Sequence, residues 1–245
     1  MRVWDIHPGY LSRQSLLGQH AEIHALAAVI EVGGKGYANH PETLRWRLNR
    51  GRLNKALDLT VYEMELRKFR HASPLPEAVD KPGEAHIYVD RPLAQIDILR
   101  EKYHLKSQAG RIPLPKNIYQ FWAHHKYSVM ARGYNNYKKI QSLLNSNQAI
   151  TFQPSEFILE EIMNYMKLPV NGPALVNVID HLWGYFKKEA GAVEKEFYLS
   201  KRIADPENLL PFLYELAGKY DRPYLLHSTV FADFTTLNQG LPDCD

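Results

Sequence analysis

The first group in the chain that could act as a nucleophile is the α-amine of Met1. An α-amine has a pKa of about 7.7–8.0, far below that of a lysine side chain, so a usable fraction is unprotonated near neutral pH. Arg2 comes next. Because initiator removal favours small second residues, we expect Met1 to stay in place. The charge of Arg2 would favour the neutral amine, and its guanidinium could hold a phosphate.

The sequence HAEIH at residues 20–24 is the nearest approach to a metal motif. His20 and His24 share one helix face. In the zinc-protease pattern H-E-x-x-H the glutamate follows the first histidine directly, whereas Glu22 points about 160° away from both histidines, at roughly 100° per residue. We therefore expect no metal site, and packing or capping roles for the two histidines. The GxSxG, Walker A and GxGxxG signatures are also missing.

Basic residues are concentrated in the N-terminal part of the chain. The formal net charge is +3, and residues 1–106, with 16 basic and 13 acidic side chains, hold the whole excess. One short stretch contains a single acid, Glu42, the aromatic residues Tyr37 and Trp46, and six basic residues: Lys35, Arg45, Arg47, Arg50, Arg52 and Lys55. This composition predicts phosphate contacts with nucleic acid. A solvated helix face is the alternative.

Apolar residues recur every three to four positions along most of the chain, which predicts helices. The expected helices cover residues 10–30, 41–46, 51–70, 92–103, 118–129, 137–144, 157–166, 173–189, 193–204 and 206–219, with a loop at 73–83. No alternating strand pattern is found. We expect an all-α fold of two helical domains, 1–106 and 118–245, joined by a linker at 107–117 with the sequence SQAGRIPLPKN.

Composition limits the class of protein. The single cysteine, Cys244, allows neither an internal disulfide nor a multi-cysteine zinc site. The start of the chain lacks the apolar region of a signal peptide, and no stretch approaches the roughly 18–20 apolar residues of a membrane span. We expect a cytoplasmic protein that neither is secreted nor enters a membrane.

Two segments resemble a known family. MRVWDIHPGYLSRQSLL at residues 1–17 and GYANHPETLRW at residues 36–46 resemble pyrimidine-dimer DNA glycosylases of the phage endonuclease V type and their bacterial relatives. The resemblance covers about residues 1–105. On the register of the phage enzyme, Arg2 matches an arginine, Gln14 a glutamine, and Glu22 the family's essential glutamate.

The resemblance implies an endonuclease V-like glycosylase fold and a glycosylase with AP lyase activity on UV lesions in double-stranded DNA, without a cofactor. The amine of Met1 would attack C1′ of the 5′ nucleoside of the dimer and form a Schiff base. Glu22, otherwise read as a surface residue, would stabilise the cationic sugar and manage the proton transfers of β-elimination. The residues expected to contact DNA are Arg2, His7, Arg13, Lys35, His40, Arg45, Arg47 and Arg50; the two histidines could equally be buried.

Three positions depart from the phage enzyme. Ala21 and Ala25 stand where it has arginines, and Ser15 stands where it has a histidine. In the phage enzyme the two arginines and the histidine act in substrate recognition rather than in bond breaking. The departures therefore concern lesion recognition. The basic residues that could compensate are Arg13, Arg45, Arg47 and Arg50.

The C-terminal part resembles the uncharacterised helical YbgA-type domain, which is also found fused to thiouracil desulfurases. The matching segments are FWAHHKYSVMARGYNNY at residues 121–137 and VNVIDHLWGYFKK at residues 176–188. His125 and Lys126 on one helix, with Asn177 and His181 on another, form a candidate polar pocket for an unknown ligand or partner. Core packing of His125 is the alternative.

Together these patterns predict a DNA repair glycosylase, associated with the nucleoid of a prokaryote. Two other functions stay open: a non-catalytic nucleic-acid-binding protein, and an enzyme that acts on modified nucleotides or RNA.

Overall fold

The computed structural model describes residues 2–33, 37–75, 87–146, 151–152 and 155–233. The described part of the chain contains helices and no strand, only an isolated antiparallel bridge between Ser12 and Gly110. The prediction of an all-α fold in two helical parts is confirmed. One compact unit ends at Leu114, and the other begins at Pro115.

The N-terminal unit is built from the helices α1 (Arg13–Val32), α2 (Pro41–Arg47), α3 (Arg50–Leu66) and α4 (Pro92–Lys106), preceded by a short 3-10 turn, η1 (Pro8–Tyr10). Local signals set the ends of α1. The Ser12 side chain accepts a hydrogen bond from the backbone N–H of Ser15, and Gly33 ends the helix in the left-handed conformation, with φ 68°. α1 begins later than predicted because residues 8–10 form η1 instead.

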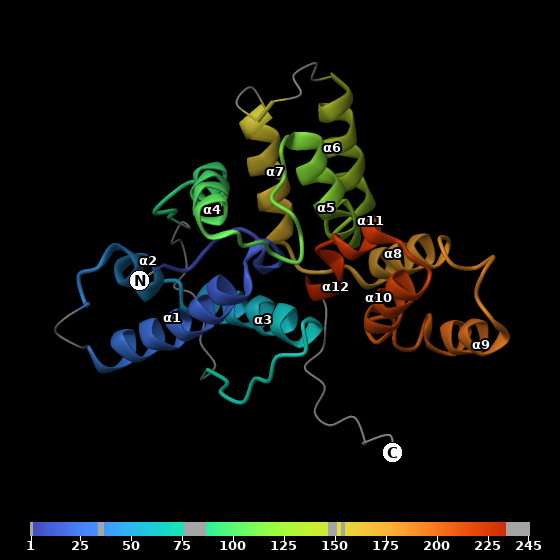
Figure 1. The fold of residues 1–245 in the computed structure, drawn as a ribbon, viewed down its shortest axis with the longest axis horizontal. Coiled ribbons are helices and arrows are strands. Elements are labelled where there is room, and N and C mark those ends of the chain that lie inside the picture. The colour runs from blue at the N-terminus through green and yellow to red at the C-terminus, as the bar shows by residue number, and fades with distance from the viewer. Residues whose placement is uncertain (1, 34–36, 76–86, 147–150, 153–154, 234–245) are drawn as a thin grey trace. The chain divides into compact units, whose positions relative to one another are not determined.

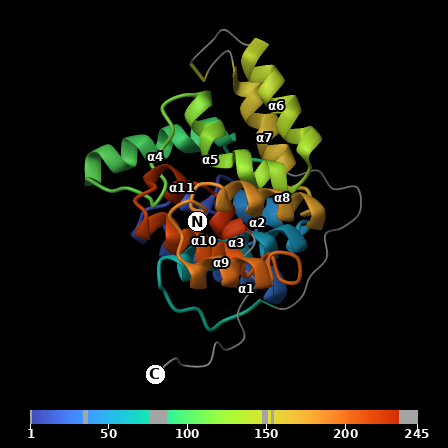
Figure 2. The ribbon, with the colours of Figure 1, turned by 90° about the vertical axis from the view of Figure 1, so that its right-hand side faces the viewer.

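An apolar core lies between α1 and α3, which run side by side (Figure 1, Figure 2). Residues of both helices meet one residue of the N-terminal segment and one of α2. The members are Val3, Ile23, Leu26, Ala27, Trp46, Leu53, Leu57 and Val61. Burying an aliphatic side chain of this size contributes roughly 1.5–3 kcal/mol, so this cluster fixes the N-terminal segment against both helices.

A second buried centre forms around Glu63 of α3. Its carboxylate accepts hydrogen bonds from Arg67 at 2.7 Å and from Arg111 at 2.9 and 2.7 Å. Burial would raise the pKa of Glu63, but the charge and hydrogen bonds of Arg111, with Arg67, lower it below its usual value. Arg67 also donates to the backbone carbonyls of Leu11 and Gly9, which ties η1 to the end of α3.

The segment expected to be a linker begins inside the N-terminal unit. Arg111 binds Glu63, the Ile112 side chain is fully buried, and the Ile112 N–H donates to the Gly9 carbonyl at 2.9 Å. Gly110 packs so closely that a Cβ there would lie 2.5 Å from the backbone of Tyr10. Residues 110–112 are therefore a structural part of this unit rather than a free connection.

The C-terminal unit contains α5 (Ile118–Ala131), α6 (Tyr134–Ser146), α7 (Glu156–Met166), α8 (Gly172–Trp183), α9 (Ala192–Lys201), α10 (Leu209–Lys219), α11 (Pro223–Leu226) and α12 (Val230–Asp233). α5 is mostly buried because α6, α7, α8 and α12 all pack against it. The helix expected over 173–189 ends at Trp183, where turns follow. α11 and α12 have four residues each, too few to show a helical period.

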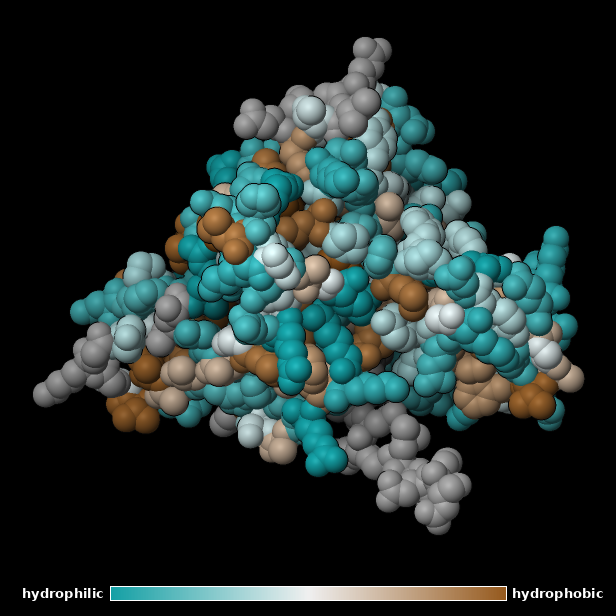
Figure 3. Space-filling model, viewed as in Figure 1, coloured by the Kyte–Doolittle hydropathy of each residue, from teal (hydrophilic) through white to brown (hydrophobic). Residues whose placement is uncertain are grey.

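No described helix is long and apolar enough to span a bilayer. On the face drawn in Figure 3, hydrophilic residues predominate, and the hydrophobic ones lie in separate groups. Isolated exposed apolar residues are ordinary on a protein surface.

Two glycines in the N-terminal unit provide a matched test of this packing. Gly110→Ala should lower the free energy of unfolding by about 1–3 kcal/mol, because the added methyl group meets backbone atoms of Tyr10. Gly18→Ala adds the same group where nothing lies within 4 Å, in the middle of α1, and should raise stability by roughly 0.5–1 kcal/mol. Urea denaturation of both variants measures this. Equal effects of the two substitutions would contradict the described packing.

Candidate functional site

Residues 2–6 precede the first helical turn and are held by side chains from three helices. Gln19 of α1 accepts a hydrogen bond from the backbone N–H of Trp4 at 2.8 Å. Gln95 of α4 accepts one from the backbone N–H of Asp5 at 2.8 Å, and donates to the Asp5 carboxylate at 2.7 Å. Arg45 of α2 completes the arrangement. We call Gln19, Arg45 and Gln95 the N-terminal clasp.

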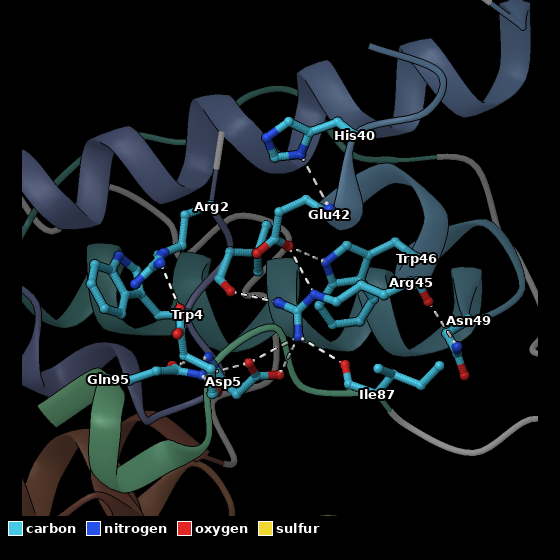
Figure 4. Close-up of polar contacts among 12 residues, drawn as sticks. Arg2, Trp4, Asp5, His40, Glu42, Arg45, Trp46, Asn49, Ile87 and Gln95 are labelled. Atoms are coloured by element: carbon cyan, nitrogen blue, oxygen red, sulfur yellow. Dashed lines mark hydrogen bonds and ion pairs between the residues drawn. The ribbon is translucent and has the colours of Figure 1, made fainter. Parts of the chain in front are cut away.

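Arg45 makes the strongest contacts of the clasp. Its guanidinium donates to both carboxylate oxygens of Asp5, at 3.0 and 2.9 Å, and to the Val3 carbonyl at 2.6 Å. The Arg45 side chain is only 3% exposed. Figure 4 shows it pointing between Asp5 and Glu42, with a further bond to the Ile87 carbonyl. Two carboxylates and two carbonyls thus compensate one buried cation.

The sequence of α2 explains why Arg45 points inward. Pro41 is the first helical residue, and the His40 ring accepts a hydrogen bond from the Glu42 N–H, which fixes the start of the helix. The Glu42 carboxylate accepts hydrogen bonds from two side chains of the next turn, from Arg45 Nε at 2.8 Å and from Trp46 Nε1 at 3.0 Å. The segment His-Pro-Glu-Thr-Leu-Arg-Trp is therefore a scaffold that aims one guanidinium at the N-terminal segment.

Arg45, His7 and Arg50, three of the residues expected to contact DNA, have partners within the N-terminal unit. Arg45 is committed to the clasp. His7 is buried, and its Nδ1 accepts from the Gly9 N–H to cap η1. The Arg50 side chain is 15% exposed and pairs with Glu31 at 2.7 Å. The fully paired and buried Arg45 is the least accessible of the three, and DNA contacts of His7 and Arg50 stay predictions.

The remaining basic candidates differ in exposure. Arg13 and Arg47 are exposed; Arg13 lies over the Phe69 ring, and Arg47 donates to the Ala38 carbonyl. Arg2 is partly exposed and pairs with Asp90 at 2.6 Å. His40 is half-buried as the cap of α2. Met1 and Lys35 lie outside the described residues, so their contacts with DNA or with Glu22 stay predictions.

Glu22 lies one helical turn after Gln19, on the part of α1 that follows the N-terminal segment. Its side chain is half-buried, and no hydrogen bond or ion pair joins it to another described residue. Trp4 is held at Gln19, while Val3 belongs to the cluster that includes Ile23 further along α1. Traced back from Trp4 to Val3, the N-terminal segment therefore follows α1 from Gln19 toward the turn that contains Glu22.

A third histidine joins the pair of the HAEIH segment. His71, in the loop after α3, lies 2.9 Å from His20, measured from His71 Nδ1 to His20 Nε2. Burial lowers the pKa of His20, as do the neighbouring rings of His24 and His71. Burial and His24 likewise lower the pKa of His71. No sequence pattern pointed to this partner, because His71 lies 51 positions after His20 in the chain.

The C-terminal candidates lie in different surroundings. The His125 side chain is buried, stacks on Phe121, and bonds to the Phe121 carbonyl at 2.8 Å. Lys126 lies over the Tyr127 and Tyr224 rings. Asn177 faces Met130, and His181 is exposed. The burial of His125 fits the alternative that this residue packs in the core. A polar pocket formed by the four residues stays a prediction.

The sequence missed most residues of the clasp. Gln19 and Gln95 are buried at positions that share a helix face with apolar residues, such as Ile23 on α1. A polar residue within an apolar stripe was the available signal, because a buried amide must find a hydrogen-bond partner.

Replacing Arg45 should destabilise the N-terminal unit far more than replacing Arg47. Arg45→Met leaves the Asp5 and Glu42 carboxylates buried without their cation, and should cost about 3–5 kcal/mol. Arg47→Met, two residues away and exposed, should stay within about 0.5 kcal/mol. Urea denaturation of the two variants measures the difference. Similar losses in both would show that Arg45 does not hold the N-terminal segment.

Two family models match the chain. Residues 1–77 match the family described as pyrimidine dimer DNA glycosylase, and residues 126–235 match a family described as a protein of unknown function, DUF1722. Comparisons with curated proteins and with solved structures gave no match. The first match spans Gln19, Glu22 and Arg45. The chain is therefore similar to the pyrimidine dimer DNA glycosylase family over its N-terminal third and to the DUF1722 family over a C-terminal segment, as the sequence predicted.

Proposed function

We propose that the chain is a DNA repair glycosylase with AP lyase activity on pyrimidine-dimer lesions in double-stranded DNA, and that the α-amine of Met1 is the nucleophile. The amine nitrogen bonds to C1′ as the N-glycosyl bond breaks and the base leaves with the bonding electrons. Ring opening gives an imine, and removal of a C2′ proton then expels the 3′ phosphate by β-elimination.

The N-terminal clasp is the observation that carries this proposal. An amine nucleophile must be held in place, since its attack depends on orientation. Residues 3–5 lie within the segment that matches the glycosylase family and are fixed by hydrogen bonds from Gln19 and Arg45 of that segment. Gln95, beyond the matched residues, adds a further bond. A chain end that served only to begin a helix would not require a buried guanidinium.

Glu22 is suited to the second role. It is half-buried, bonds to no other described residue, and lies on the turn of α1 toward which the N-terminal segment runs. A carboxylate in such a place can stabilise the developing positive charge on the sugar and transfer the C2′ proton. Its lack of a described partner leaves it available for substrate.

DNA contacts are assigned to the exposed basic residues of the N-terminal unit. Arg13 and Arg47 are exposed, and Arg2 is partly exposed beside the proposed nucleophile. Reaching C1′ of a base-paired nucleotide requires bending the duplex or extruding a base, which costs a few kcal/mol that phosphate contacts must offset. The proposed reaction itself uses only side chains, the terminal amine and water.

Borohydride trapping tests the covalent step and Glu22 together. With dimer-containing or abasic duplex DNA and reductant, the protein should give a covalent adduct. Glu22→Gln should slow strand cleavage by about 10²–10⁴-fold, the usual scale of acid–base assistance. Glu101→Gln, an exposed glutamate of α4, is the matched control and should leave cleavage unchanged.

Two results would count against this assignment. Salt-dependent binding to undamaged DNA without any trapped adduct would favour the non-catalytic nucleic-acid-binding alternative. Unchanged cleavage by Glu22→Gln would remove Glu22 from the reaction.

Blocking the chain end tests the nucleophile separately. An extension left on Met1 should abolish trapping and cleavage, because the amine becomes an amide, whereas a C-terminal extension should change neither. Trapping yield and strand cleavage on abasic duplex are the measurements. Equal activity of the two proteins would rule out the terminal amine and point to a side-chain nucleophile.

A further inference from the structure

We propose that His20, His24 and His71 form a binding site for a divalent transition-metal ion of the zinc class. The site joins α1 to the loop that follows α3. It takes no part in the proposed base-excision chemistry, because Glu22 points to the opposite side of α1 from the two helix histidines.

The three rings are close to the spacing that a metal requires. One nitrogen from each ring can be chosen so that all three lie within 4.8 Å of one another. Two nitrogens bound to zinc at about 2.0–2.1 Å, at a tetrahedral angle, lie roughly 3.3 Å apart. The His20 and His71 nitrogens, at 2.9 Å, must separate slightly, and the widest pair must close by at most about 1.5 Å. Rotations of the side chains supply movements of this size.

The donor set selects the class of metal. All three donors are imidazole nitrogens, and the group contains no carboxylate. Imidazole suits zinc, copper and nickel, whereas magnesium and calcium require oxygen ligands. Three protein ligands leave the fourth position of a tetrahedral zinc ion to a water molecule.

The site without a metal leaves a buried nitrogen unsatisfied. His24 Nε2 is buried and has no hydrogen-bond partner within the described residues. A buried polar atom left in this way costs its desolvation free energy, which a metal–ligand bond would offset. The His20 and His24 rings meet edge to face, with centroids 4.7 Å apart, so both can turn toward a common point. Neutral rings are the form that binds metal.

The position of His71 indicates a structural role. Phe69 and His71 follow the end of α3, and Leu75 packs against the apolar core shared by α1 and α3. A metal held by His71 and by two residues of α1 would fasten this loop at a second point. Such a link stabilises the folded chain, because an ion that binds only the folded state adds to its stability.

Metal titration of the full chain tests the site. The protein, prepared without a polyhistidine tag and stripped with a chelator, should bind one equivalent of Zn²⁺ in calorimetry. Co²⁺ should give the absorption of a nitrogen-ligated ion, and Mg²⁺ should not compete. His71→Ala should weaken Zn²⁺ binding by at least about 10-fold, since even the partners that orient metal ligands are worth 10–100-fold. His104→Ala, an exposed histidine of α4, should bind as the parent chain does.

Chemical modification keeps the test decisive if His71→Ala does not fold. In the unaltered protein, Zn²⁺ should protect His20, His24 and His71 from diethyl pyrocarbonate and leave His104 reactive, as mapped by mass spectrometry. Absence of saturable binding, unweakened binding by His71→Ala, or no selective protection would overturn the proposal. Borohydride trapping by the metal-stripped protein should be unchanged. Failure of the metal-site proposal can therefore be told apart from failure of the glycosylase proposal.

Discussion

The buried guanidinium of Arg45 is the constraint on which the N-terminal unit depends. A cation removed from water is tolerated only when its charge and its N–H groups are compensated, and here Asp5, Glu42 and two backbone carbonyls do this. Those partners come from the N-terminal segment, from α2 and from the segment before α4. Once the Arg45 guanidinium has these partners, the N-terminal segment has a fixed path along α1.

The residues that carry the family resemblance are explained by this constraint. In the segment GYANHPETLRW, His40 caps α2, Pro41 begins it, and Glu42 orients both Arg45 and Trp46. All three tasks are hydrogen bonds or backbone constraints within the unit itself. The attack proposed for the terminal amine would need a rigid scaffold behind the chain end, and this segment supplies one. The reactive groups proposed here, Met1 and Glu22, are few beside the residues that place them.

α1 presents different chemistry on its two sides. The turn of Glu22 follows the N-terminal segment, whereas His20 and His24 turn toward His71. Glu63 adds a second compensated charge at the far end of α3, where Arg67 and Arg111 tie η1 and residues 110–112 to the helix. The N-terminal unit is thus held around one apolar core by three polar contacts, which are those of Arg45, of His20 with His71, and of Glu63. This division leaves the glycosylase proposal and the metal proposal independent of each other.

The sequence by itself determined the longer helices, the two-part architecture and the similarity to two families, because apolar period and motifs are local properties of the chain. It also identified Glu22 as a candidate and the N-terminal segment as special. Only the tertiary structure decided that Arg45, His7 and Arg50 serve internal partners, that Gln19 and Gln95 hold the N-terminal segment, and that His71 joins His20. The physical reason is that burial and pairing depend on residues far apart in the chain, and a charged or imidazole side chain has the same identity in the sequence whether it meets solvent, a carboxylate or another ring.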